Sequence, residues 1–252
     1  MILDANSPTP LHAQLEAILR CNIKDGTWPE DAKIPSENEL SQSCGISRMT
    51  ARTVISKLVQ EGLLYRVQGK GTFVSPRKIV SRPLSQMGIR QQLDKKGYAS
   101  TTKLISAEKL PADSYTAGIL RMEIGEPIFR LCRVRFVKKV PLSLHTSFIP
   151  AVVCPDLLER GFPFEEVQLC EILEQSYGID PKCMTETLEI SLATKEQMAL
   201  LNVPENYPLI HLENTVFGKD GRPAEFSSVL FRGDRIKIEI QNIYGDQEIR
   251  GS

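Results

Sequence analysis

Apolar residues recur at helical spacing in three short segments at the start of the chain. The first segment, about 11–25, carries its leucines and isoleucines on one face. Ser36 and Glu39 have the three-residue spacing of a capping box, which predicts that a second helix begins after Ser36. Ser47 then caps a third helix, whose apolar stripe ends before Gly62. This order, with a glycine turn before the third helix, is typical of a helix-turn-helix.

A short hairpin pattern follows the third helix. Residues 63–67 and 72–74 are expected to pair as two strands, with the turn Gln68-Gly69-Lys70-Gly71 between them. The turn also contains the Gly and Lys of a nucleotide-binding P-loop, and a Thr follows. However, six residues separate Gly62 from Gly69, whereas a P-loop has four. We therefore interpret the turn as the wing of a winged helix-turn-helix and expect a DNA-binding domain at 1–76.

The rest of the chain predicts an α+β domain at 85–245, built around an antiparallel sheet. Residues 77–84 lack periodicity and are expected to form a linker between the domains. The Asp-Gly turn at 220–221 predicts a hairpin near the end of the chain. The expected helices are 85–96 (or from Gly88), 113–122, 168–177 and 194–201, and the expected strands are 102–107, 127–137, 142–149, 184–192, 209–217 and 224–231.

Composition limits the classes of function. The 252 residues carry zero net charge and are 41% hydrophobic, as in globular proteins of one or two domains. Six cysteines form no CxxC pair and three histidines do not cluster, so we expect no metal, cofactor or redox centre. The sequence has neither a signal peptide nor an apolar segment of membrane-spanning length, so we expect a soluble, cytoplasmic protein without a membrane partner.

Charge is unevenly distributed along the chain. Residues 46–90 contain nine Lys or Arg and one Asp or Glu, whereas the rest of the chain is acidic. The third expected helix has no acid before Glu61. A generic three-helix core predicts a mixed polar face, whereas an acid-free face fits a polyanion. Residues at the start of such a helix reach base edges in the major groove, and a wing tip at Lys70 reaches backbone phosphate.

Two arginines share one face of an expected strand. In residues 129–137, alternation places Arg133 and Arg135 on the same side as Phe129. Two guanidinium groups on a largely apolar face repel each other unless a negative charge lies between them. One interpretation is a solvent-facing surface or an internal ion pair, with Glu225 as a candidate partner. The other is a ligand site that holds a carboxylate or a phosphate.

The run IPSENELSQSCGISRMTARTVISKLVQEGLLYRVQGKGTFV, residues 34–74, resembles the winged helix-turn-helix of GntR-type bacterial transcription regulators. Asn38 stands where this family often has arginine, and Met49 where a small polar residue is common, so the operator sequence is not implied. The DNA contacts that the resemblance implies are Ser36, Asn38, Ser47, Arg48, Met49, Thr50, Arg52, Gln68, Gly69 and Lys70.

Residues 83–243 resemble the UTRA ligand-binding domain of the HutC subfamily. The resemblance rests on the RVR strand, VPLSLHTSFIP, ILEQSYGI, LNVPENYPLIHLENTVFGKDGRPAEFSS and FRGDR. It implies an effector pocket on one face of the sheet. Gln168 and Phe231 stand where the family usually has a serine and an aromatic hydroxyl. The effector-binding residues that the resemblance implies are Ile89, Arg90, Arg133, Arg135, Gln168, Glu225 and Phe231.

These features favour an effector-responsive transcription regulator, in particular a repressor that a small anionic metabolite releases from a palindromic operator. One winged helix buries little surface, so a homodimer is expected to bind two half-sites. The alternative is an enzyme, because the UTRA fold resembles that of chorismate lyase. Against it, the sequence shows no nucleophile beside a base and no motif of paired carboxylates. The expected partners are double-stranded operator DNA, a small-molecule effector such as a sugar phosphate, and a second copy of the chain.

Overall fold

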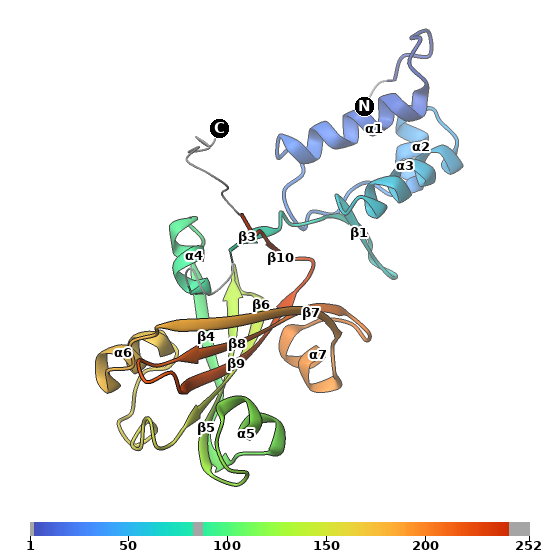
Figure 1. Cartoon of the computed structure of the whole chain (residues 1–252). Helices are drawn as coiled ribbons and strands as arrows, with labels where there is room; N and C mark the ends of the chain where they lie inside the picture. Colours follow the sequence, from blue (N-terminus) through green and yellow to red (C-terminus); the bar gives the residue numbers. More distant parts are fainter. Residues whose placement is uncertain (1–2, 83–87, 242–252) are drawn as a thin grey trace. The chain divides into compact units, whose positions relative to one another are not determined.

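The computed structural model describes residues 3–82 and 88–241, and the chain divides into two compact units between Lys78 and Ile79. The first unit contains three helices and a two-stranded hairpin, as the sequence predicts (Figure 1). Its elements are α1 (Leu11–Lys24), α2 (Glu37–Cys44), α3 (Arg48–Gln60), β1 (Leu64–Val67) and β2 (Gly71–Val74).

One apolar core holds the first unit together. Leu15 and Leu19 of α1, Leu40 of α2 and Leu58 of α3 have no exposed surface, and Leu64 of β1 is 1% exposed. Complete burial of a leucine side chain contributes roughly 1.5–3 kcal/mol. Each helix therefore directs its apolar stripe at the others, and the start of α3 stays on the surface.

The second unit is an α+β domain around a six-stranded sheet of order β4-β5-β6-β9-β8-β7. All neighbouring strands of this sheet are antiparallel. The strands are β4 (Ser100–Pro111), β5 (Pro127–Val137), β6 (Val140–Pro150), β7 (Cys183–Leu192), β8 (Pro208–Phe217) and β9 (Pro223–Arg232). The helices are α4 (Ile89–Lys95), α5 (Ser114–Leu120), α6 (Leu169–Tyr177) and α7 (Lys195–Leu201). The fold class is the one that the sequence predicts, and the largest boundary difference is at β4.

Both faces of the sheet are covered. On one face, α6 packs against Phe129 and Leu131, and α4 packs against Phe231. On the other face, α7 packs against Cys132, and α5 packs against Ile128. Because successive strand residues point to opposite faces, odd-numbered β5 residues up to Arg135 face α4 and α6. Arg133 and Arg135 are therefore on a covered face and not on an open surface.

Residues 79–81 correct the expected linker. Ile79–Ser81 form β3, which pairs in parallel with β10 (Ile236–Ile238), so this part of 77–84 belongs to the second unit. Ile79 is 6% exposed, and Ser81 is 1% exposed and donates to Oε1 of Gln92 at 2.9 Å. The sequence missed the pair because its two strands are three residues long and lie far apart in the chain. The expected linker residues 83–84, the helix start at Ser85 and the domain end at 245 lie outside the described residues.

Candidate DNA-binding and effector sites

The predicted DNA contacts lie at the starts of two helices and at the hairpin turn of the first unit. Ser36 precedes α2, Ser47 precedes α3, and Gln68 to Lys70 form the turn between β1 and β2. Nine of the ten predicted residues are exposed, and Thr50 is half-buried. Met49, at 64% exposure, is among the most exposed large apolar side chains of the chain. The structure therefore makes these positions accessible to a partner.

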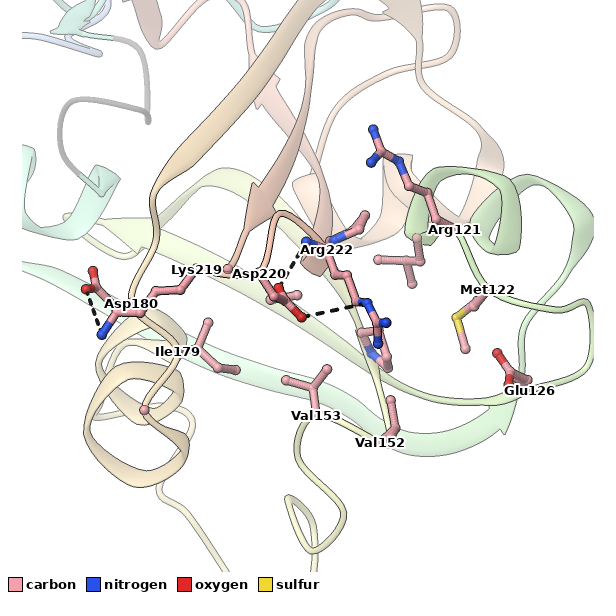
Figure 2. Close-up of a pocket in the computed structure, with 16 residues that line it drawn as sticks. Arg121, Met122, Glu126, Val152, Val153, Ile179, Asp180, Lys219, Asp220 and Arg222 are labelled. Carbon is pink, nitrogen blue, oxygen red and sulfur yellow. Dashed lines mark hydrogen bonds and ion pairs between the residues drawn. The ribbon is translucent and has the colours of Figure 1, made fainter.

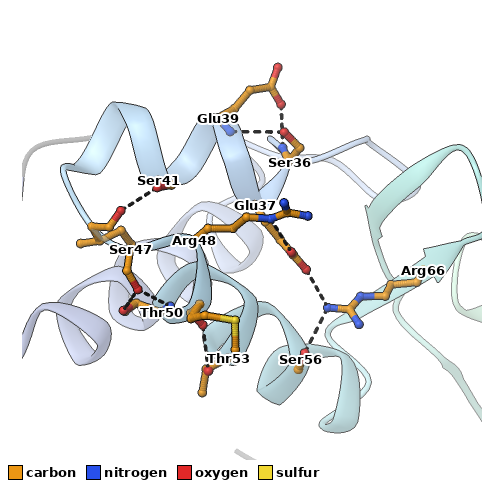
Figure 3. A network of polar contacts seen from close by, with 12 residues as sticks. Ser36, Glu37, Glu39, Ser41, Ser47, Arg48, Thr50, Thr53, Ser56 and Arg66 are labelled. Carbon is orange, nitrogen blue, oxygen red and sulfur yellow. Dashed lines mark hydrogen bonds and ion pairs between the residues drawn. The ribbon is translucent and has the colours of Figure 1, made fainter.

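Two serines fix the helix starts (Figure 3). The Ser36 hydroxyl accepts from the backbone N–H of Glu39 at 3.3 Å, while the Glu39 carboxylate accepts from the Ser36 N–H at 2.7 Å. This second bond is the main cause of the lowered pKa of Glu39. The Ser47 hydroxyl accepts from the Thr50 N–H at 3.0 Å. Such caps satisfy N–H groups that have no partner within a helix, so they fix the residues at which α2 and α3 begin.

The wing turn depends on two glycines with positive φ. Gly69 has φ 72° and Gly71 has φ 124°, which L side chains rarely adopt. A Cβ at Gly71 would lie 2.8 Å from Cε of Lys33, whereas a Cβ at Gly69 would meet nothing within 4 Å. Gly69 therefore borders open space, and Lys70 beside it is exposed.

Some basic side chains of α3 and the hairpin form ion pairs within the unit, and others do not. Lys57 pairs with Glu16 of α1 at 2.9 Å, so it is neutralised within the unit. Arg48 and Arg66 both contact Glu37. Within the part of the chain that the structure describes, Arg52 and Lys70 form no ion pair. The sequence counts Lys57 and Arg52 alike, and only the fold separates them.

Strand register places further polar residues beside the two arginines of β5. Arg133 is opposite His145 and Arg135 is opposite Ser143. A bulge between Arg135 and Phe136 sets this register. The sequence did not identify these two β6 residues, because an unbulged hairpin would place them on the opposite face.

Both guanidinium groups are buried and incompletely hydrogen-bonded. Arg133 and Arg135 are each 8% exposed. Nη2 of Arg133 donates to the Ser147 hydroxyl at 3.2 Å, but Nε of both arginines and Nη1 of Arg135 have no partner among the residues that the structure describes. No described carboxylate lies within 4.0 Å of either group, so Glu225, the candidate partner in the ion-pair interpretation, forms no direct pair with them. Buried donors without partners cost about 1–3 kcal/mol each and are few in native proteins, so these nitrogen atoms need an explanation.

The surrounding pKa shifts have the same cause. Burial lowers the pKa of Arg133, and burial together with the charge of Arg133 lowers the pKa of Arg135 to about 10. Burial, and then the two arginine charges, hold the pKa of His145 well below its usual value. Burial raises the pKa of Glu225, against the effects of the Ser147 hydroxyl and Arg133. On the described part of this face, the two guanidinium groups therefore form no ion pair, and the charge of Glu225 acts on Arg133 only at longer range.

The remaining predicted effector residues border these two arginines. Ile89 is buried at the start of α4, and the charge of Arg90 acts on Arg135. Arg90 donates to the Glu166 carbonyl and lies 4.0 Å from Asp94. Gln168 precedes α6, and its Oε1 would lie 3.1 Å from a Cβ at Gly88.

Two residues of β8 and β9 lie on the same face of the sheet as the arginines. Phe231 is fully buried, and its ring lies edge-on to His145 with 6.1 Å between the ring centroids. Asn214 of β8 is 7% exposed, and no described residue is a hydrogen-bond partner of its Oδ1. By strand alternation it shares the face of Arg133, since it is opposite Ser227, which is opposite Ser147. Arg133, Arg135, Glu225 and Phe231 thus share one face of the sheet with Ser143, His145, Ser147 and Asn214. Ile89, Arg90 and Gln168 belong to α4 and to the start of α6, which pack on this face.

A separate groove of about 880 Å³ lies at the β8–β9 turn (Figure 2). Val152, Val153 and Ile179 line it. Its charged groups compensate one another, because Arg222 lies 3.8 Å from Asp220 and Lys219 pairs with Asp180. None of the predicted effector residues lines this groove, so its position does not support the effector site.

Two family models match the chain. Residues 11–74 match "Bacterial regulatory proteins, gntR family", and residues 95–237, more than half of the chain, match "UTRA domain". The chain belongs to the gntR family and carries a UTRA domain. Both resemblances that the sequence suggested are therefore confirmed.

Several curated relatives of this gntR protein are repressors. It is 30% identical to the HTH-type transcriptional repressor NagR of Bacillus subtilis, over 93% of this chain and 96% of the relative. It is 30% identical to a probable fructoselysine utilization operon repressor of Escherichia coli (95% and 97%) and 28% identical to the histidine utilization repressor of Pseudomonas putida (92% each). Among solved structures, PhnF from Mycobacterium smegmatis covers 93% of this chain and 100% of its own, with 26% identity and a TM-score of 0.64.

These matches cover both units, so the gntR protein is a ligand-responsive, DNA-binding transcriptional repressor and not an enzyme. Within the described residues, no helix has the length and apolar character needed to cross a membrane. Nor do three or more described His, Cys, Asp or Glu side chains gather where they could hold a metal ion.

Proposed function

We propose that this repressor binds a palindromic operator as a homodimer and is released when a small anionic metabolite binds beside Arg133 and Arg135. The observation that carries the proposal is the pair of buried guanidinium groups with unpartnered N–H donors. An anion bound there would accept those hydrogen bonds and neutralise the positive charge of the arginines. The regulator then acts in the cytoplasm, where its operator lies.

On the DNA side, the first turn of α3 reads base edges and the wing contacts the backbone. The first turns of α3 carry Arg48, Met49, Thr50 and Arg52, and the helix has no acid before Glu61. This is expected of a helix that contacts base edges in the major groove. Lys70 carries the charge at the wing tip. The remaining proposed contacts are Ser36, Asn38, Ser47, Gln68 and Gly69.

On the effector side, the proposed ligand carries an anionic group and hydrogen-bond donors. Arg133 and Arg135 bind the anionic group. The side-chain oxygen atoms of Glu225 and Asn214 accept hydrogen bonds from the donor groups of the ligand. Ile89, Arg90, Gln168 and Phe231 complete the boundary. The names of the relatives support a metabolite as the ligand, since two of them refer to the utilization of histidine or fructoselysine.

The proposed homodimer is supported by the edges of the sheet. The edge strand β4 carries two lysines, a terminal proline and a bulge, which all oppose pairing with another strand. The other edge strand, β7, has neither lysine nor proline, and it exposes Leu188 (41%), Ile190 (78%) and Leu192 (59%). Contact with a second copy of the chain would bury these apolar side chains and pair the free edge of β7.

The test combines operator selection with effector screening. Operator fragments would be selected from random duplex DNA, and the mass of the bound complex would be measured by sedimentation. Phosphorylated and carboxylated metabolites would then be screened for release of DNA. Release from wild type, but not from Arg133→Gln/Arg135→Gln with intact DNA binding, supports the proposal. A monomer on an asymmetric site, or release that survives both substitutions, would overturn it.

A further inference from the structure

Glu37 connects three elements of the DNA-binding unit through one carboxylate (Figure 3). Its Oε1 lies 3.3 Å from Nη2 of Arg66 on β1, and its Oε2 lies 3.7 Å from Nε of Arg48 on α3. Nη2 of Arg66 also donates to the Ser56 hydroxyl of α3 at 3.0 Å. Each oxygen of Glu37 thus contacts a different arginine, Arg48 on α3 and Arg66 on β1, the strand that leads to the wing.

The exposure of these groups indicates what the contacts do. The side chain of Glu37 is 23% exposed, whereas those of Arg48 and Arg66 are 67% and 43% exposed. Ion pairs between exposed groups contribute little to stability, and the apolar core already holds the helices together. The contacts therefore matter more for the position and charge of the arginines than for the fold.

A phosphate backbone attracts any accessible guanidinium regardless of base sequence. Discrimination between operator and random DNA consequently requires that Arg48 binds less readily to phosphate than to the correct base edge. A carboxylate in contact with Arg48 limits the directions in which its guanidinium can point. The same carboxylate offsets part of the positive charge that a random duplex would meet.

We propose that Glu37 is a specificity-determining positioning residue of the DNA-binding surface. It holds Arg48 and Arg66 in place, and it competes with non-operator phosphate for both guanidinium groups. On the operator, Arg48 exchanges part of its contact with Glu37 for a base edge, while Arg66 keeps the wing strand in register with α3. The inference rests on the proposed contact between Arg48 and DNA.

Glu37→Gln is the direct test, and Glu61→Gln is its matched control. Both remove one negative charge from the same unit, but Glu61 lies at the end of α3 and pairs with Arg20 instead. Dissociation constants for operator and for random duplex would be measured at several salt concentrations. We expect Glu37→Gln to tighten binding to random duplex, and the ratio of operator to random affinity to fall by about tenfold, the effect of losing one good base contact. Glu61→Gln should change both affinities by the same factor.

A double-mutant cycle separates positioning from a general structural role. In an Arg48→Ala/Arg66→Ala background, Glu37→Gln should no longer change the affinity ratio, whereas a structural effect would persist there. The melting temperature of Glu37→Gln should match that of Glu61→Gln. An unchanged ratio, or an effect that persists without the arginines, would overturn the role of Glu37. If Arg48→Ala alone leaves operator binding intact, the proposed DNA contact itself is wrong.

Discussion

Replacing Arg135 by methionine should make the unliganded protein more stable while removing its response to the effector. Arg135 is 8% exposed, and two of its nitrogen atoms have no hydrogen-bond partner in residues 3–82 and 88–241. Burial and the charge of Arg133 lower its pKa to about 10, from a usual value of 12.5. At about 1.4 kcal/mol per pKa unit, the charged form carries a cost of about 3 kcal/mol in the folded state.

Methionine fills a similar volume without a charge, so part of this cost disappears. We expect a gain of about 1–3 kcal/mol in the free energy of unfolding, because relaxation around the charge already relieves some of the cost. For a domain of this size, each kcal/mol raises the melting temperature by about 2–4 °C. Thermal and urea denaturation without ligand would measure the gain.

Arg130→Met provides the control on the same strand. Arg130 pairs with Glu108 at 3.0 Å and is partly exposed, so its loss should change stability by less than about 0.5 kcal/mol. A destabilised Arg135→Met protein would mean that the guanidinium has a structural partner. That result would refute the ligand-site interpretation and favour the ion-pair interpretation of the two arginines.

Three further outcomes are expected. Arg48→Ala should cost about 1–3 kcal/mol of operator binding and relax preference at one base pair, as measured by binding to single-base operator variants. Lys70→Ala should weaken operator and random duplex alike and reduce the salt dependence by about one counterion, as seen in the slope of log affinity against log salt. The lowered pKa of His145 means that the unfolded chain takes up its proton first, so stability should fall as the pH drops below about 6.5. Urea denaturation between pH 5 and 8 should show this loss in wild type and less of it in His145→Gln.

The sequence predicted the first unit well because its signals are local. Caps at Ser36 and Ser47, the glycine before α3 and the glycines of the wing each act within a few residues. Which cations stay available for DNA is not a local property. Lys57 is neutralised by Glu16, 41 residues earlier in the chain, and only the packing of α1 against α3 shows it.

In the second unit, period-two alternation correctly placed Arg133 and Arg135 on one face. It could not identify the residues opposite them, because the bulge at Arg135 shifts the register of β6 by one residue. Without the bulge, Ser143 and His145 would face away from the arginines. Asn214 was missed for a related reason, since its place on this face depends on two strand pairings across β9.

The parallel pair of β3 and β10 joins the first strand of the second unit to its last described strand. β3 begins at Ile79, directly after the last residue of the DNA-binding unit. The backbone N–H of Ile79 donates to the carbonyl of Arg235 at 2.8 Å. Arg235 is four residues from Phe231, whose ring lies edge-on to His145 at the proposed effector site. Truncation of the chain before Ile236 would therefore leave β3 without its partner strand. It would also remove a strand pair that connects Ile79, where the second unit begins, to the segment that follows Phe231.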